Sequence, residues 1–131
     1  MLIAPSELWP MRSLVRKCQE YADASGSTIT ISDNTNDVEG ADIIYTDVWI
    51  SMGEEEKTDE RKALLHKYQV NRKLMEKTQK DTTIFMHCLP AVKGYEVTED
   101  VFESPASVVF DEAENRLHTI KAVMVATLGE E

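Results

Sequence analysis

The sequence is poor in cysteine, in basic residues and in long apolar runs. Two cysteines, Cys18 and Cys88, occur in 131 residues, which is too few for a disulfide framework and favours a reducing compartment. Asp and Glu outnumber Lys and Arg by 24 to 14, and the resulting net charge of −10 offers no basic stripe for a nucleic-acid backbone. No apolar run approaches the roughly 20 residues of a membrane span, and the N-terminus shows no secretory signal pattern. We therefore expect a cytoplasmic protein without nucleic-acid or membrane partners.

Glycine is also scarce, with 5 in the chain, and none stands in a Gly-x-Gly-x-x-Gly or P-loop pattern. A self-contained nucleotide-binding site is therefore not expected. Metal binding is not favoured either, because His66 and His118 lie far in sequence from the adjacent His87 and Cys88.

The residues that are present alternate between short β-rich runs and longer helical stretches. This alternation predicts an α/β fold with a mainly parallel sheet flanked by helices. A hydrophobic share of 42% and the absence of a linker indicate one globular domain. Asn34 and Asn71 are expected to cap helices, one long helix is expected to end at Gly26, and another to cover residues 112–128. The expected strands cover residues 2–4, 28–31, 43–46, 83–88 and 107–110.

Three loops follow expected strands, and parallel α/β sheets bind ligands at the carboxyl ends of their strands. In the first loop, Asp47 can bind a substrate ammonium group or cap the next helix, and spacing alone favours the cap. Ser51 and Met52, followed by Gly53, can present backbone N–H groups to a carboxylate. An ordinary helix cap is the commoner reason for such a pattern.

The second and third loops contain Cys88 and Arg116. Cys88 beside His87 suggests a nucleophile, but adjacent strand residues point to opposite faces, so a catalytic Cys–His dyad is not favoured. A buried structural cysteine and a non-covalent role at the strand end both stay open. Arg116 can bind an anionic ligand or pair with the acidic residues at 111–114, and the local charge favours the surface pair.

Taken together, five strings, in this order and spacing, resemble the ornithine carbamoyltransferases across essentially the whole chain. The strings are Tyr-Thr-Asp-Val-Trp-Ile-Ser-Met-Gly-Glu (45–54), Lys-Tyr-Gln-Val-Asn (67–71), His-Cys-Leu-Pro-Ala (87–91), Glu-Val-Thr-Glu-Asp-Val-Phe-Glu (96–103) and Phe-Asp-Glu-Ala-Glu-Asn-Arg (110–116). The resemblance implies a Rossmann-like domain. It also implies that the δ-amine of L-ornithine attacks carbamoyl phosphate to give citrulline and phosphate, in arginine metabolism, with no cofactor and no metal.

The resemblance also implies roles for individual residues. Asp47 would bind the ornithine α-ammonium group, Ser51 and Met52 would hold ornithine as well, and Cys88 would lie beside the attacking δ-amine. The backbone at Cys88 and Leu89, with Arg116, would contact carbamoyl phosphate. The catalytic residues expected on this basis are Asp47 and Cys88. The expected assembly is a homo-oligomer, a trimer in the family.

The chain departs from the family pattern in what it does not contain. The strings Ser-Thr-Arg-Thr and His-Pro-x-Gln of the family's first domain do not occur, and neither does the Gly-Asp-Gly-Asn-Asn turn that begins its second domain. Residues 1–131 are therefore expected to be the ornithine-binding second domain without its first βα unit, and without the carbamoyl-phosphate domain. In the strand order 3-2-1-4-5, that missing strand is central and would leave a gap between residues 2–4 and 43–46.

Two further functions stay open beside the transferase. One is a non-catalytic fragment or amino-acid-binding domain of the same family, because the phosphate-binding strings are absent. The other is a putrescine-type carbamoyltransferase, although Ser-Met-Gly at 51–53 favours a substrate that carries an α-carboxylate. The isolated chain is expected to be inactive. It is also expected to associate through exposed apolar surface, because apolar residues cover nearly every face of its final helix.

Overall fold

The structure is a computed structural model that describes residues 1–50, 53 and 55–129. Its strands are β1 (Leu2–Ile3), β2 (Ile31–Ser32), β3 (Ile43–Thr46) and β4 (Ile84–His87). Its α-helices are α1 (Arg12–Ser25), α2 (Thr58–Leu65), α3 (Arg72–Glu76), α4 (Glu99–Phe102) and α5 (Val109–Leu128). Short 3-10 helices cover Ser6–Leu8, Thr35–Val38, Glu55–Lys57 and His66–Tyr68.

The strands form two separate parallel pairs, which confirms the predicted α/β fold. β1 pairs with β2, and β3 pairs with β4 over four residues, from Ile43 opposite Ile84 to Thr46 opposite His87. The two pairs are not hydrogen-bonded to each other in the described part of the chain. The sheet is thus interrupted between β1 and β3, which is the place where the strand order predicts a gap.

Local signals in the sequence account for several helix ends. The Asn34 and Asn71 side chains accept hydrogen bonds from the N–H groups of Asn36 and Leu74, so both predicted caps are confirmed. Helix α1 ends at Gly26, whose φ of 73° is the left-handed conformation that glycine adopts without steric cost.

The predicted strand at 107–110 is wrong. Ser107 forms one isolated parallel bridge with Phe85, and the chain then enters α5 at Val109. A short apolar run cannot by itself distinguish a strand from the buried first turn of a helix. Here Val109 is buried while the adjacent Phe110 is exposed, and Asp111 and Glu112 complete a first turn favoured by the helix dipole.

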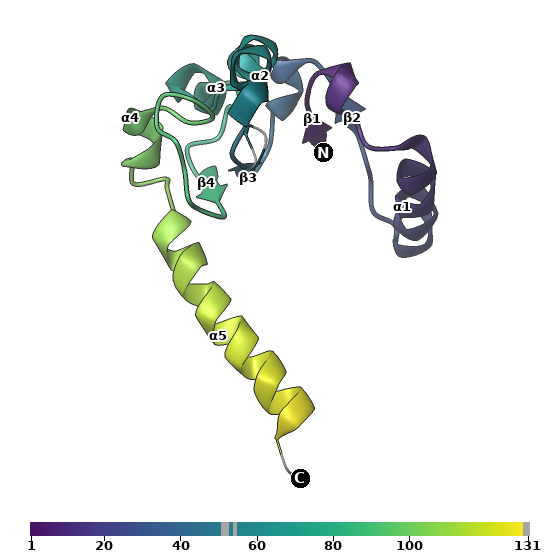
Figure 1. The fold of residues 1–131 in the computed structure, drawn as a ribbon. Coiled ribbons are helices and arrows are strands. Elements are labelled where there is room, and N and C mark those ends of the chain that lie inside the picture. The colour runs from purple at the N-terminus through teal and green to yellow at the C-terminus, as the bar shows by residue number, and fades with distance from the viewer. Residues whose placement is uncertain (51–52, 54, 130–131) are drawn as a thin grey trace.

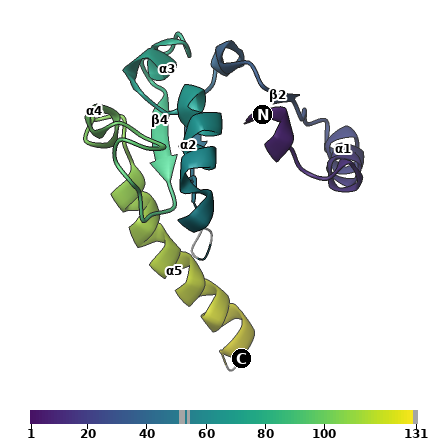
Figure 2. The same ribbon diagram turned by 45° about the horizontal axis from the view of Figure 1, so that its top comes forward.

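One hydrophobic core lies around β3 and β4. Phe85 of β4 is fully buried, and Ile44 of β3 is buried beside it. The other core residues come from the segments that cover this strand pair: Val38, Val70, Leu74, Val97, Val101, Phe102 and Val109. Figures 1 and 2 show α1 and α5 projecting away from this body in both views. No helix among the described residues is long and apolar enough to cross a membrane.

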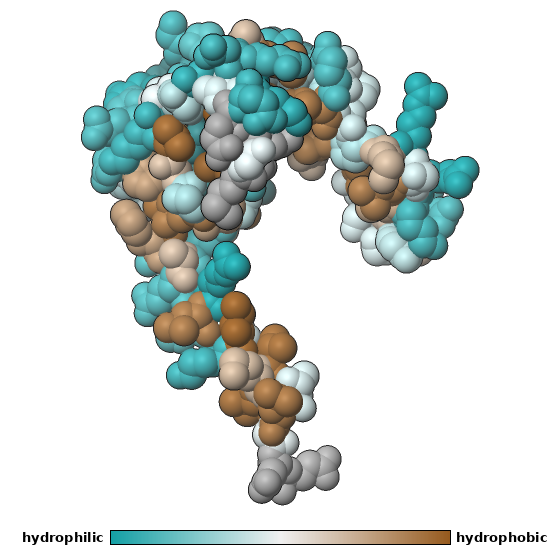
Figure 3. Space-filling view, viewed as in Figure 1, coloured by the Kyte–Doolittle hydropathy of each residue, from teal (hydrophilic) through white to brown (hydrophobic). Residues whose placement is uncertain are grey.

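Helix α5 exposes a large apolar surface from Leu117 to Leu128. Six residues share this exposure, and in Figure 3 hydrophobic atoms cover much of the projecting helix. They are Leu117, Ile120, Val123, Met124, Val125 and Leu128, each more than half exposed. Surfaces of this kind mark contacts with other protein surfaces.

We expect the isolated chain to bind a hydrophobic dye and to associate as its concentration rises. Lysine substitution at both Val123 and Val125, which are exposed, should reduce dye binding and association together. Light scattering over a concentration series measures the association, and a double substitution at exposed polar positions, Lys17 and Glu20 of α1, serves as the control. A monodisperse parent chain without dye binding would contradict this expectation.

Candidate functional site

The candidate site lies where β3 and β4 end side by side. Asp47 follows β3 directly and Cys88 follows β4, and the parallel register places Thr46 opposite His87. The Cys88 thiol donates a hydrogen bond to Asp47 Oδ1 over 3.1 Å. The expectation that both residues share one edge of the sheet therefore holds, because parallel strands bring their carboxyl ends to the same side.

Asp47 does not cap a helix, so the interpretation favoured by spacing is wrong. Its Oδ1 accepts the N–H of the next residue, Val48, over 2.7 Å, and the next helical segment among the described residues begins at Glu55. Residues 47–50 are not helical, so no helix begins directly after Asp47. The Asp47 carboxylate is exposed at the end of the strand, where it can meet a cation.

The Cys88 thiol is protonated rather than reactive in this setting. Burial of the thiol, followed by its hydrogen bond to Asp47 and the charge of that carboxylate, raises the pKa of Cys88. A thiolate is the nucleophilic form, and a raised pKa keeps its population low near neutral pH. Cys88 therefore suits a role in positioning a ligand group.

His87 is committed to structural hydrogen bonds and is not a partner for Cys88. The imidazole is fully buried, its Nδ1 accepts the N–H of Leu89 over 2.9 Å, and its Nε2 lies 3.2 Å from Glu96 Oε1. Since Nδ1 is an acceptor, the neutral ring carries its proton on Nε2 and donates it to Glu96. A Cys–His dyad is absent, as expected from the alternation of side chains along β4.

The same contacts set the backbone of the loop at Leu89. Leu89 has a φ of 55°, a left-handed conformation that is uncommon for a residue with a branched side chain. Its N–H is held by His87 Nδ1. Glu96 Oε1 also accepts the N–H of Val92 over 2.6 Å, so one buried carboxylate holds both ends of the segment from His87 to Val92. The N–H of Leu89 is therefore occupied by His87, so a backbone hydrogen bond from Leu89 to a ligand would have to use its carbonyl oxygen.

Tyr45 and Glu112 belong to the site although sequence reasoning gave them no role in it. Desolvation and a hydrogen bond to the Glu112 carboxylate raise the pKa of Tyr45 to about 12, so the phenol stays protonated. Glu112 Oε2 also accepts the N–H of His87 over 3.1 Å, which ties the first turn of α5 to the end of β4. The sequence feature that could have identified Tyr45 as a site residue is its position two residues before Asp47, in the same strand.

Arg116 lines the same cavity as Cys88, and the predicted local ion pairs do not form. The cavity has a volume of about 360 Å³, lies between β3, β4 and α5, and includes Tyr45 and Glu112 in its wall. Among the described residues Arg116 has no ion pair. Two of the nearby acidic residues have other partners: Glu112 accepts from His87, and Glu114 pairs with His118 over 3.3 Å. The Arg116 guanidinium is therefore available to an anion.

Three potential metal ligands lie close together at this site. One atom each of Asp47, His87 and Cys88 lies within 4.8 Å of the others. Both ring nitrogens of His87 already have partners, so the arrangement leaves Asp47 and Cys88 as available ligands. Two ligands are fewer than the three or four that protein zinc sites use.

The predicted ornithine contacts at Ser51 and Met52 lie outside the described residues. The site is thus built from four parts of the chain: the end of β3, the loop after β4, the buried Glu96 and the first turns of α5. It combines an exposed carboxylate, a protonated thiol and a guanidinium that has no ion pair within the described part of the chain. Such a set can bind a ligand that carries an ammonium group together with one that carries an anionic group.

Comparison with known proteins gives one consistent result. Residues 1–127 match the family model described as "Aspartate/ornithine carbamoyltransferase, Asp/Orn binding domain". The ornithine carbamoyltransferase of Thermotoga maritima is 56% identical over 125 residues, which cover 95% of this chain and 40% of the relative. That of Caldanaerobacter subterraneus is 55% identical over 126 residues, with the same shares covered.

A solved structure agrees with these matches. The ornithine carbamoyltransferase from Pyrococcus furiosus superposes with a TM-score of 0.90 and 42% identity, over 98% of this chain and 41% of that one. The chain therefore spans about 40% of the length of the curated relatives it matches.

Proposed function

This chain belongs to the aspartate/ornithine carbamoyltransferase family, through its Asp/Orn binding domain, and on that premise we propose that it forms the ornithine-binding half of an ornithine carbamoyltransferase. The reaction would transfer the carbamoyl group of carbamoyl phosphate to the δ-amine of L-ornithine. The observation that carries the proposal is the contact between Asp47 and Cys88 at the adjoining ends of β3 and β4. It places a carboxylate and a thiol where a bound amino acid can meet both.

In the proposed reaction the neutral δ-amine attacks the carbonyl carbon of carbamoyl phosphate. The tetrahedral intermediate then collapses, the bond from that carbon to the phosphate oxygen breaks, and its electron pair leaves with phosphate. The amine loses one proton, which departs with the phosphate or to solvent. The products are citrulline and phosphate, and no group of the protein becomes covalently attached.

The residues of the site divide into two roles under this proposal. Asp47 binds the α-ammonium group of ornithine, and the protonated thiol of Cys88 positions the δ-amine. The raised pKa of Cys88 supports direct attack by the amine, because a covalent carbamoyl-cysteine would require the thiolate. The backbone at Cys88 and Leu89, together with Arg116, contacts carbamoyl phosphate; Cys88 and Arg116 line the same cavity. Ser51 and Met52 add contacts to ornithine.

Substituting Asp47 with Asn tests this assignment. The change keeps the shape of the side chain but removes the charge that meets the α-ammonium group. Loss of a charge-assisted hydrogen bond costs about 1.5–3 kcal/mol, so ornithine affinity should fall roughly 10- to 150-fold. Isothermal calorimetry with ornithine measures the change.

The matched control is Asp42→Asn, since Asp42 is an exposed aspartate that pairs with Lys80 before β3 and lies outside the site. This variant should bind ornithine like the parent. Equal ornithine affinity in the parent and in Asp47→Asn would reject the proposed role of Asp47.

A second candidate function is an amino-acid-binding domain without its own catalysis. It is favoured by the span of the chain, about 40% of its curated relatives, and by the single cation that lines the described cavity at Cys88. Ornithine binding without citrulline formation would identify it. Putrescine, which keeps both amino groups of ornithine but lacks its α-carboxylate, provides the comparison ligand for the remaining alternative, a putrescine-type enzyme.

A further inference from the structure

Three side chains beside the candidate site contact one another and have no part in the proposed contacts with ligands. Trp49 lies two residues after Asp47, in the chain that follows β3. Tyr95 lies in the segment after β4, and its ring stacks on that of Trp49, with 6.4 Å between the ring centroids and 12° between the ring planes. The Nζ of Lys62, in α2, lies 3.9 Å from the centroid of the Tyr95 ring. We call these three side chains the aromatic clasp.

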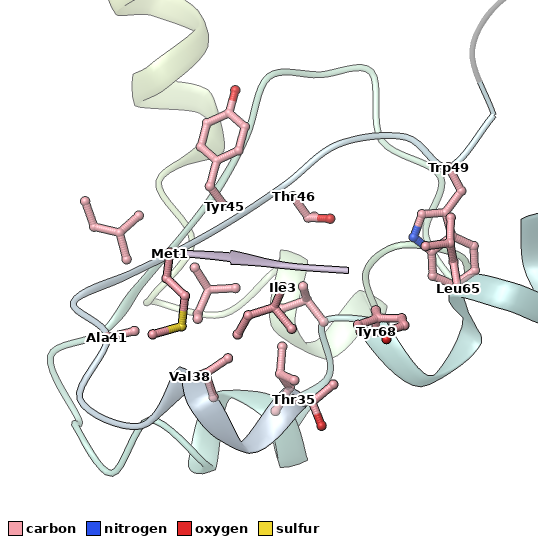
Figure 4. Close-up of a pocket in the computed structure, with 14 residues that line it drawn as sticks. Met1, Ile3, Thr35, Val38, Ala41, Tyr45, Thr46, Trp49, Leu65 and Tyr68 are labelled. Atoms are coloured by element: carbon pink, nitrogen blue, oxygen red, sulfur yellow. The ribbon is translucent and has the colours of Figure 1, made fainter. Parts of the chain in front are cut away.

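The Trp49 side of the clasp connects the end of β3 with helix α2. Trp49 is half-buried. It lines a cavity of about 240 Å³ together with Leu65, the last residue of α2, and Figure 4 shows both side chains at one end of this cavity. Trp49 thus extends from the end of β3 toward α2. Its stack on Tyr95 therefore brings together three parts of the fold: the chain after β3, helix α2 and the segment after β4.

The Tyr95 side of the clasp is fixed by hydrogen bonds to its backbone. Gln69 Nε2 donates to the carbonyls of Gly94 and Tyr95, over 3.0 and 2.8 Å. The next residue, Glu96, is fully buried, and its Oε1 lies 3.2 Å from His87 Nε2. The Tyr95 ring is therefore attached to a backbone that is held at the end of β4. A ring in a fixed position is a suitable surface for a second ring to stack on.

Asp47, in contrast, is weakly restrained by its own contacts. Its carboxylate is exposed and accepts hydrogen bonds from the Val48 N–H and from the Cys88 thiol. The first of these bonds moves with the Asp47 backbone, because its donor is the adjacent residue. The second comes from a thiol, which is a weak donor. Neither bond alone holds the carboxylate in one place relative to β4, whereas the stack of Trp49 joins the same stretch of chain to the fixed segment.

We propose that the aromatic clasp holds the Asp47 carboxylate beside the Cys88 thiol. Trp49 and Tyr95 are then positioning residues, each acting through the backbone of its own segment. Lys62 supports them through its cation–π contact with Tyr95. The inference rests on the proposed function only in what the carboxylate is positioned for, the ammonium group of a bound amino acid. Since the contact is between ring faces, a phenylalanine at position 95 should serve as well as tyrosine.

The Cys88 thiol reports the position of the Asp47 carboxylate. The carboxylate adds to the effect of burial in raising the pKa of Cys88, so its displacement should lower that pKa. The measurement is the pH dependence of iodoacetamide alkylation of the 131-residue chain. A Cys18→Ser background leaves Cys88 as the one thiol in the sequence. Asp47→Asn gives the shift expected when the charge of the carboxylate is lost altogether.

Variants in both segments test whether the clasp sets this position. Tyr95→Ala removes one ring and should move the alkylation midpoint to lower pH, in the direction of Asp47→Asn. Trp49→Leu, on the other side of the stack, should do the same. The double variant should shift the midpoint no further than the larger single shift, because both substitutions break the same contact.

Two further variants separate positioning from a general effect on the fold. Tyr95→Phe keeps the ring and should titrate like the parent. The matched control is Tyr21→Ala, because Tyr21 also has a lysine over its ring, with Lys17 Nζ at 4.8 Å from the centroid, but lies on α1. This control should leave the alkylation midpoint unchanged. Circular dichroism checks that each variant keeps the helical content of the parent, and Trp49→Leu decides the outcome if Tyr95→Ala does not fold.

Ornithine binding gives a second readout. Loss of an aromatic pair should weaken ornithine binding by Tyr95→Ala about two- to tenfold in calorimetry, whereas Tyr95→Phe should bind like the parent. Absence of ornithine binding by the parent chain would reject the proposed function. The alkylation midpoints would still decide whether the clasp positions Asp47, because they require no ligand.

Three results would overturn the inference. The first is an unchanged alkylation midpoint in folded Tyr95→Ala or Trp49→Leu, which would show that Asp47 keeps its place without the clasp. The second is a double variant whose shift is the sum of the two single shifts, which would mean that the rings act independently. The third is a Tyr95→Phe variant that titrates like Tyr95→Ala, since the stacked ring would then not be the group responsible.

Discussion

The purified 131-residue chain, supplied with carbamoyl phosphate and ornithine, is expected to form no citrulline above a boiled control. Carbamoyl phosphate is a dianion, and the chain carries a net charge of −10. Arg116 is the one cation that lines the described cavity at Cys88. Acyl-type transfer depends on preorganised donors around the carbonyl and the leaving group, and loss of a single such donor costs about 10²–10³ in rate.

The rate should therefore lie more than about a thousandfold below that of a full-length relative, since several donors would be missing together. A colorimetric citrulline assay measures it, with the Thermotoga maritima ornithine carbamoyltransferase as the positive control. Citrulline formation by the isolated chain within a hundredfold of that control would show that residues 1–131 supply the phosphate-binding groups themselves.

The largest expected effect on stability comes from Glu96. Its carboxylate is fully buried and accepts two hydrogen bonds, from His87 Nε2 and from the N–H of Val92. Glu96→Ala leaves the buried His87 donor without an acceptor, at about 1–3 kcal/mol, and removes the acceptor of the partly buried Val92 N–H, at about 0.5–1.5 kcal/mol, so the free energy of unfolding should fall by about 1.5–4.5 kcal/mol. Urea titration followed by tryptophan fluorescence measures the loss. Glu96→Gln keeps a carbonyl oxygen as acceptor and should cost less.

The chain contains a matched control for this substitution. Glu114 pairs with His118 over 3.3 Å on α5, but its side chain is 71% exposed. Exposed pairs contribute about 0–1 kcal/mol, so Glu114→Ala should change the unfolding free energy by no more than that. If Glu96→Ala cost no more than Glu114→Ala, the buried carboxylate would not be holding the loop after β4.

Local residue patterns were sufficient for some features of this fold. Asn34 and Asn71 cap helices, and Gly26 ends one, because each acts through hydrogen bonds or backbone angles within a few residues. The contact between Asp47 and Cys88 could also be expected, because each directly follows one of two parallel strands.

Other features depend on distant parts of the chain. The apolar run that begins at Val108 is equally compatible with a strand and with the start of a helix. The packing of Val109 against the core favours the helix. Arg116 has acidic neighbours in sequence, yet Glu112 turns toward the N–H of His87 and Glu114 toward His118. These partners of Glu112 and Glu114 cannot be predicted from the charges of the neighbouring residues alone.

The sequence by itself determined the family, the α/β alternation and the position of Asp47 and Cys88 at strand ends, since these follow from motif order and from local geometry. The tertiary structure decided two other things. It buried Glu96 under His87, and it raised the pKa of Tyr45 and Cys88 by desolvation and neighbouring carboxylates. Each of these depends on burial and on contacts between segments far apart in the chain, which no local pattern specifies.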